Sequence, residues 1–163
     1  MTTTSSSDIS AFHETVAELD YPMIVVTVPG SGCLVGFSTQ CSIDPPRYLV
    51  LISKKNHTHE AARRASAMAV HVLDEADRHL AEVFGQLTGD VVDKLSLVSW
   101  SEGPEGVPIL DGSAAWFAGR VLDRFDGGDH TGFVLEPVAA ERRRPITQLG
   151  FQGVKDLDPG HDP

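Results

Sequence analysis

The sequence has little of what several classes of protein require. It contains two cysteines, Cys33 and Cys41, among 163 residues, so no disulfide framework stabilises it and we expect both thiols to be buried and unreactive. No apolar run approaches the ~20 residues that a membrane-spanning helix needs. The first residues, "MTTTSSSD", lack the basic start and apolar stretch of a signal peptide. These features predict a protein of the reducing cytoplasm with no membrane partner.

Basic residues and catalytic motifs are also scarce. The chain has 13 Lys and Arg against 23 Asp and Glu, a net charge of −10, which argues against nucleic acid as a partner because phosphate binding needs an excess of cations. There is no HExxH, paired CxxC, GxSxG or glycine-rich loop entering a helix. His57 and His59 lie two residues apart without further ligands nearby in the sequence, so we predict no metal site.

What the chain does contain predicts one domain with short appendages. Its length is enough for a core without metal or disulfides. Residues 1–20 are predicted to be an amphipathic helix after a disordered start, with Ile9, Phe12, Val16 and Leu19 at helical spacing. Residues 21–145 form the predicted domain, and residues 146–163 a polar tail with a disordered end.

Within the domain, the pattern predicts mostly β structure with short helices. Strands are expected at Met23–Val28, Cys33–Ser38, Arg47–Ser53 and Met68–Leu73, and two more flank a turn at Gly127–Gly128. Helices are expected over residues 56–66, capped by Asn56 or Thr58, and after Asp74, where Leu80, Val83, Phe84 and Leu87 form one face and "TGD" ends the helix. Residues 101–112 suggest a long Gly/Pro loop. Six strands, mostly joined as hairpins, predict a small antiparallel barrel.

One group of polar residues suggests a binding site. Thr39, Gln40 and Ser42 precede "DPP", and Lys54, Lys55, Asn56 and Thr58 follow the next strand. A helix N-terminus next to a lysine can bind phosphate through free N–H groups and positive charge. The arrangement fits a phosphorylated cofactor better than a metal, with an ordinary capped helix as the alternative.

Longer stretches resemble a known family. "CLVGFSTQCSIDPPRYLVLISKKNHTHEAARRASAMAVHVL", "LAEVFGQLTGDVVDK" and "GVPILDGSAAWFAGRVLDRFDGGDHTGFVLEPVAA" are similar to the flavin reductase-like family, the FMN-binding split barrels, from about Tyr21 to Ala140. The resemblance implies a six-stranded antiparallel FMN-binding split barrel and a homodimer with the flavin near the subunit interface. Many members reduce free flavin with NADH or NADPH and supply it to a partner monooxygenase.

The resemblance also assigns residues. It places flavin contacts on the segment comprising Phe37, Ser38, Thr39, Gln40, Cys41 and Ser42, and phosphate contacts on Lys54, Asn56 and Thr58. His130, in "GDHTGF", matches a family histidine near the flavin or nicotinamide ring and is the candidate catalytic residue; the alternative is that it fixes the hairpin through Asp129. Two segments depart from the family pattern, "GFST" and "ITQLGFQG", so FMN, FAD and a deazaflavin all remain candidate cofactors.

The predicted function is therefore that of an NAD(P)H-dependent flavin reductase, the reductase component of a two-component monooxygenase that receives diffusible reduced flavin. Hydride passes between the nicotinamide and flavin cofactors, which explains why the sequence shows no acid–base pair or nucleophile. Two alternatives stay open: a flavin carrier without turnover, and a split-barrel oxidoreductase that uses deazaflavin.

Overall fold

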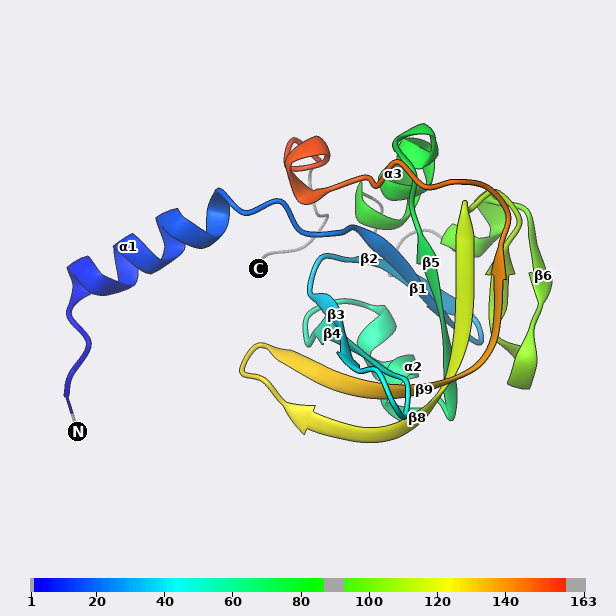
Figure 1. Ribbon diagram of the computed structural model, residues 1–163, viewed down its shortest axis with the longest axis horizontal. Helices are drawn as coiled ribbons and strands as arrows, with labels where there is room; N and C mark the ends of the chain where they lie inside the picture. The colour runs from blue at the N-terminus through cyan, green and yellow to red at the C-terminus, as the bar shows by residue number, and fades with distance from the viewer. Residues whose placement is uncertain (1, 87–92, 158–163) are drawn as a thin grey trace.

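The fold is built on one antiparallel sheet. The computed structural model describes residues 2–86 and 93–157 (Figure 1). The seven strands of the main sheet lie in the order β2-β1-β5-β8-β9-β4-β3. Their bounds are β1 Ile24–Val28, β2 Ser31–Val35, β3 Ser38–Ser42, β4 Arg47–Ser53, β5 Ala67–Val72, β8 Ala115–Asp126 and β9 His130–Arg142.

Turn chemistry and apolar runs explain most of these strands. β1 is buried along its whole length, and it turns into β2 through Gly30, whose φ of +81° suits glycine. The β8–β9 hairpin turns at Gly127–Gly128, where Gly128 has a φ of +113°. The predicted turn at Gly127–Gly128 and the strands β1, β4 and β5 are thus confirmed, with shifts of one residue at some ends. The strand predicted at Cys33–Ser38 begins and ends earlier, as β2 (Ser31–Val35).

The two edges of the sheet are consecutive in the chain. Only Gly36 and Phe37 separate β2 at one edge from β3 at the other, so the sheet has to roll until its edges approach. A hydrogen bond from Leu51 N–H to the Phe37 carbonyl, 2.9 Å long, ties this joint to β4. The result is an antiparallel barrel split beside residues 36 and 37, with seven strands in the main sheet and not the six expected.

Helices cover parts of the barrel. α2 (Thr58–Arg64) has His57 at its N-cap position, so neither predicted cap, Asn56 or Thr58, occupies it. Asn56 lies one residue earlier, and its Oδ1 accepts a hydrogen bond from Thr58 N–H at 2.9 Å. Asp74 caps η1 (Glu75–Asp77), which leads into α3 (Arg78–Gln86). Leu80 and Phe84 of α3 are buried, as predicted. Leu87 and the predicted stop at "TGD" lie outside the described residues.

α1 (Ser6–Ala17) differs from the other helices because none of its residues is buried. Ser5 and Asp8 form a reciprocal capping box that fixes its first turn. Figure 1 shows α1 projecting from the barrel as an arm at the N-terminal end. The predicted helix is confirmed, but its apolar side does not pack on its own domain.

Three expectations need correction. Residues 101–112 are not a plain loop, because β6 (Trp100–Glu102) pairs with β7 (Pro108–Leu110). Val107, Ile109 and Leu110 are buried, and Pro104 and Gly106 form the η3 turn (Pro104–Gly106) between the two strands. Polar residues Ser38–Ser42 form the separate edge strand β3. Cys41, on that exposed edge, is accessible and not buried.

The segment that follows the predicted domain boundary also packs on the barrel. Leu149 and Val154 are 5% and 4% exposed, and they lie in the cluster that contains Phe84 and Leu110. The short helix η4 (Phe151–Gly153) follows a bridge between Pro22 and Gly150. Two buried apolar residues, Leu149 and Val154, are enough to hold this polar stretch on the barrel.

Candidate functional site

A cavity of about 360 Å³ lies at the split of the barrel. This volume falls within the range of small-molecule sites, ~300–1,000 Å³. The cavity wall is formed by the end of β2, the Gly36–Phe37 connection, the end of β4, the β8–β9 turn, and the segments that contain Tyr21 and Phe151. Its lining residues are Tyr21, Met23, Cys33, Leu34, Val35, Gly36, Phe37, Leu51, Ile52, Ser53, Asn56, Asp129, His130 and Phe151.

Four rings in a row line this cavity. Phe151 stacks on Tyr21 with centroids 4.7 Å apart and planes at 19°, and Tyr21 meets Phe37 edge-on at 5.9 Å. Phe37 in turn lies 4.8 Å from the His130 ring. Such pairs hold each other's orientation and offer flat faces to a ligand. A wall of this kind fits a planar heteroaromatic ring system.

The polar atoms gather on the side of the cavity formed by β4 and the hairpin turn. Asp129 Oδ1 accepts a bond from His130 Nδ1 at 2.6 Å, and this bond is the main cause that lowers the pKa of Asp129. The ring's other nitrogen, Nε2, is then the one available to a ligand. Ser53 and Asn56 add hydroxyl and amide groups.

The cavity lining also contains the thiol of Cys33, which is not reactive. Burial raises the pKa of the Cys33 thiol to about 11, so this cysteine is not a thiolate nucleophile at neutral pH. The cavity therefore suits binding and orientation of a cofactor ring, and Cys33, the cysteine in its lining, is not a nucleophile.

The predicted phosphate residues are only partly brought together. Asn56 lines the cavity, but Thr58 is 1% exposed and its hydroxyl is within 2.7 Å of the Ser31 hydroxyl. Lys54 lies next to the site and pairs with Asp126 at 2.9 Å, with its side chain 41% exposed. Thr58 is thus a buried residue that supports the turn, while Asn56 lines the cavity and Lys54 lies beside it.

The predicted flavin segment is also divided. Phe37 lines the cavity, whereas Ser38 to Ser42 run along edge strand β3 outside it. Ser38 hydrogen-bonds with Tyr48 at 2.9 Å, and Gln40 donates to the Ser42 carbonyl at 3.3 Å. These side chains stabilise the edge and lie outside the cavity lining.

Sequence reasoning missed Tyr21 and Phe151 as site residues. They are distant in sequence, and the hydrogen bond from Phe151 N–H to the Tyr21 carbonyl, 2.8 Å long, joins their backbones. The available signal was Phe151 as a lone aromatic in "ITQLGFQG", a segment assigned to the tail.

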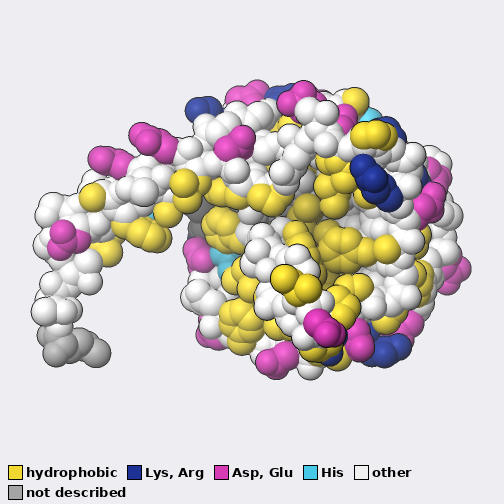
Figure 2. All heavy atoms as spheres, in the orientation of Figure 1, with side chains coloured by type: hydrophobic (Ala, Val, Ile, Leu, Met, Phe, Trp, Pro, Cys, Tyr) yellow, Lys and Arg dark blue, Asp and Glu magenta, His cyan; other side chains and the backbone are white. Residues whose placement is uncertain are grey.

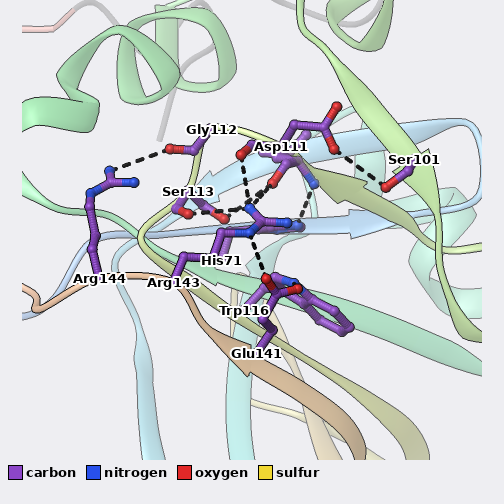
Figure 3. Close-up of polar contacts among 10 residues, drawn as sticks. His71, Ser101, Asp111, Gly112, Ser113, Trp116, Glu141, Arg143 and Arg144 are labelled. Atoms are coloured by element: carbon purple, nitrogen blue, oxygen red, sulfur yellow. Dashed lines mark hydrogen bonds and ion pairs between the residues drawn. The ribbon is translucent and has the colours of Figure 1, made fainter.

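A second polar cluster, shown in Figure 3, serves the fold. The His71 ring bridges Val25 O and Leu110 N at 3.0 Å each. Arg143 donates to the carbonyls of Leu110, Asp111 and Ser113 at 2.7, 3.0 and 3.3 Å. Because these groups satisfy one another, the cluster locks the β7–β8 connection and is not a ligand site.

Comparisons with known proteins agree with this geometry. The family model "Flavin reductase like domain" matches residues 16–154. An NADH-dependent FAD reductase of Streptomyces globisporus is 32% identical over 141 residues, covering 82% of this chain and 78% of that protein. The crystal structure of the Streptomyces globisporus C-1027 NADH:FAD oxidoreductase SgcE6 superimposes with a TM-score of 0.77 at 27% identity, over 92% of this chain and 90% of the other.

Other relatives are longer than this chain. The stachydrine N-demethylase reductase subunit Stc3 of Rhizobium meliloti (strain 1021) is 29% identical over 80% of this chain. The chain spans 58% of Stc3 and 41% of a second relative from the same organism. Within residues 2–86 and 93–157, no helix is long and apolar enough to cross a membrane.

Proposed function

Because the chain belongs to the flavin reductase-like domain family, we propose that it is an NAD(P)H-dependent flavin reductase that acts on FMN or FAD. The observation that carries this proposal is the cavity at the barrel split, lined by the rings of Tyr21, Phe37, His130 and Phe151. A flavin bound there supplies the acceptor for a hydride from the nicotinamide.

The protein's own part is to bind, orient and exclude water. Phe37 and its aromatic neighbours provide the apolar wall for a flat ring, and Ser53 and Asn56 provide polar contacts at its edge. Asp129 holds the His130 imidazole through Nδ1, which orients Nε2 for a ligand. His130 thus serves as the residue that positions the reacting rings.

Lys54 is the proposed phosphate contact. Its present partner, Asp126, has a side chain 75% exposed, and exposed ion pairs contribute little to stability because water screens them. Exchanging that carboxylate for a phosphate therefore costs little. Thr58 and Asn56 shape the turn that carries the lysine.

We also propose a homodimer. Leu49, Leu51 and Val134 alternate with the core residues Val50, Ile52 and Phe133, so they lie on the opposite, outer face of the sheet. Phe125 pairs with Gly132 on that face and is 42% exposed. We call Leu49, Leu51, Phe125 and Val134 the outer sheet face. Leu51 also lines the cavity, so a second subunit on this face borders the flavin site.

The cellular role follows from the same chemistry. Stc3 is named as a reductase subunit, and this supports a role as the reductase component of a two-component monooxygenase, with reduced flavin as the diffusible product. A need for NADH or NADPH supports a location in the cytoplasm.

The test is a flavin titration followed by anaerobic reduction. We expect the protein to quench the fluorescence of FMN or FAD at micromolar concentration, and the 450 nm absorbance of the bound flavin to bleach on addition of NADH or NADPH. Binding without bleaching under both reductants would identify a carrier and refute the reductase. Binding of a deazaflavin alone would refute the choice of cofactor.

Two variants separate phosphate binding from ring positioning. Lys54→Ala should weaken FMN about ten- to a hundredfold, because a charge-assisted contact contributes about 1.5–3 kcal/mol, and should leave riboflavin unchanged. The difference should shrink at high salt. His130→Ala should keep FMN affinity and slow the reduction step in stopped flow. Lys55→Ala is the control; equal losses for FMN and riboflavin in Lys54→Ala would place the phosphate elsewhere.

A further inference from the structure

Within residues 2–86 and 93–157, nothing buries the apolar side of α1. Ile9 and Phe12 are 45% and 59% exposed, and Leu19, just beyond the helix, is 54% exposed. These residues and Val16 recur at helical spacing and form one stripe. Glu14 and Glu18 fall on the opposite side. A helix of 12 residues is marginal by itself in water, so a helix with such a stripe gains stability only when the stripe is covered.

The chain's own barrel is not placed to cover it, because the exit of the arm is fixed. The Gln152 side chain donates to the carbonyls of Ala17 and Leu19 at 2.9 and 3.0 Å, and Gln152 N–H donates to Asp20 Oδ1 at 2.9 Å. Residue 22 bridges to residue 150. These bonds aim α1 away from the barrel (Figure 1). Because residues 2–86 and 93–157 do not bury the stripe, this geometry favours cover by another molecule.

Charge and apolar surface both favour a second copy of this chain as that molecule. The first 46 residues contain no Lys or Arg, so the arm is acidic and apolar. Residues 47–64, which form β4 and α2, contain five Lys and Arg against one acidic residue. β4 also carries Leu49 and Leu51 of the outer sheet face. A copy of the chain thus offers an apolar strip that matches the stripe. The net positive segment beside that strip attracts the acidic arm as a whole and not through direct pairs, because Glu14 and Glu18 point away from the stripe and Arg47 and Lys54 already pair with Glu136 and Asp126.

The arrangement of the α1 arm and the barrel leaves space for a second copy. Figure 2 shows apolar atoms along the side of the arm that turns toward the body and the hollow beside it. The tip of the β8–β9 hairpin reaches toward the same side of the molecule (Figure 1). The arm and the hairpin lie on either side of one open face of the molecule (Figure 1). β4, which carries part of the outer sheet face, lies next to this opening.

We propose that α1 is an exchanged arm: each subunit lays the stripe of Ile9, Phe12, Val16 and Leu19 on the outer sheet face of a second copy, and receives the partner's arm in return. This rests on the homodimer of the proposed function and specifies how it is held together. The arm leaves the barrel at Tyr21, which lines the flavin cavity, so the exchange ties the cavity wall of one subunit to the position of the other.

The experiment is photo-cross-linking in the full chain. Phe12 is replaced by p-benzoylphenylalanine, and Glu14, on the opposite side of the same helix, receives the same group as the control. We expect irradiation to give a covalent dimer from position 12, mapped by peptide mass spectrometry to β4 or the β8–β9 hairpin, and at least fivefold less from position 14. The double variant Ile9→Ser/Phe12→Ser should raise the dimer dissociation constant at least tenfold without changing flavin affinity at saturating protein.

The outcomes separate this proposal from the one beneath it. A wild-type monomer in light scattering would overturn the homodimer and the arm exchange together. A wild-type dimer whose position 12 cross-links to its own chain, to nothing, or no better than position 14 would overturn the exchange alone. An unchanged dissociation constant in the double variant would do the same.

Discussion

His71 is fully buried, and its titratable ring has a structural role. Burial is the main cause that lowers its pKa from 6.5 to about 4, and the nearby Arg143 lowers it further. The neutral ring donates Nδ1–H to the Val25 carbonyl and accepts the Leu110 N–H at Nε2. It therefore joins β1 to the end of β7 only while it is uncharged.

This predicts acid sensitivity in a defined range. Above pH 6.5 the ring is neutral in both the folded and unfolded states. Below it the unfolded chain binds a proton that the folded chain does not, so stability falls from pH 6.5 toward pH 4 by up to about 3 kcal/mol. His71→Gln should reduce that fall in urea titrations at pH 7 and pH 4.5, and the exposed His79→Gln should not. Parallel pH profiles for wild type and His71→Gln would contradict the assignment.

At the scale of elements, the segment that contains η4 packs on the barrel and pairs with residues 21–22. Leu149 is 5% exposed and its N–H bonds to the Leu73 carbonyl at 2.9 Å. Removing a buried leucine side chain costs about 2–5 kcal/mol. Leu149→Ala should therefore lower the free energy of unfolding by that amount, measured by urea denaturation. Lys155→Ala, at an exposed position of the same segment, should change it by less than about 0.5 kcal/mol. If Leu149→Ala left the free energy of unfolding unchanged, the segment would be a loose tail that does not stabilise the barrel.

At the scale of the whole molecule, the outer sheet face predicts the assembly. Each chain has a mass of 17.5 kDa, so light scattering should report twice that mass, about 35 kDa. Obligate interfaces bury on the order of 2,000 Å² or more and are largely apolar, so a buried charge there is costly. Val134→Asp should shift the mass toward that of one chain. Leu97→Asp, at a position 53% exposed in η2 (Lys94–Leu97), is the control. A dimer that survives Val134→Asp would place the interface elsewhere.

Local features of the sequence were sufficient to predict most elements. Period-two and continuous apolar runs predicted β1, β4, β5 and the β8–β9 hairpin, and Asn56 and Asp74 marked two helix starts. The motifs from residue 36 to 59 and around His130 were sufficient for the resemblance to the family. These signals are local because turn, cap and alternation chemistry act between residues close in the chain.

The tertiary structure alone decided what meets at the site. The rolling of the sheet brings residue 37 beside residue 130, and the pairing of residues 20–23 with residues 149–152 stacks Phe151 on Tyr21. The same packing buries Thr58, which the sequence had suggested as a contact, and leaves α1 unburied by residues 2–86 and 93–157. No local pattern encodes these outcomes, because each depends on strand order and on contacts between segments that are distant in the sequence.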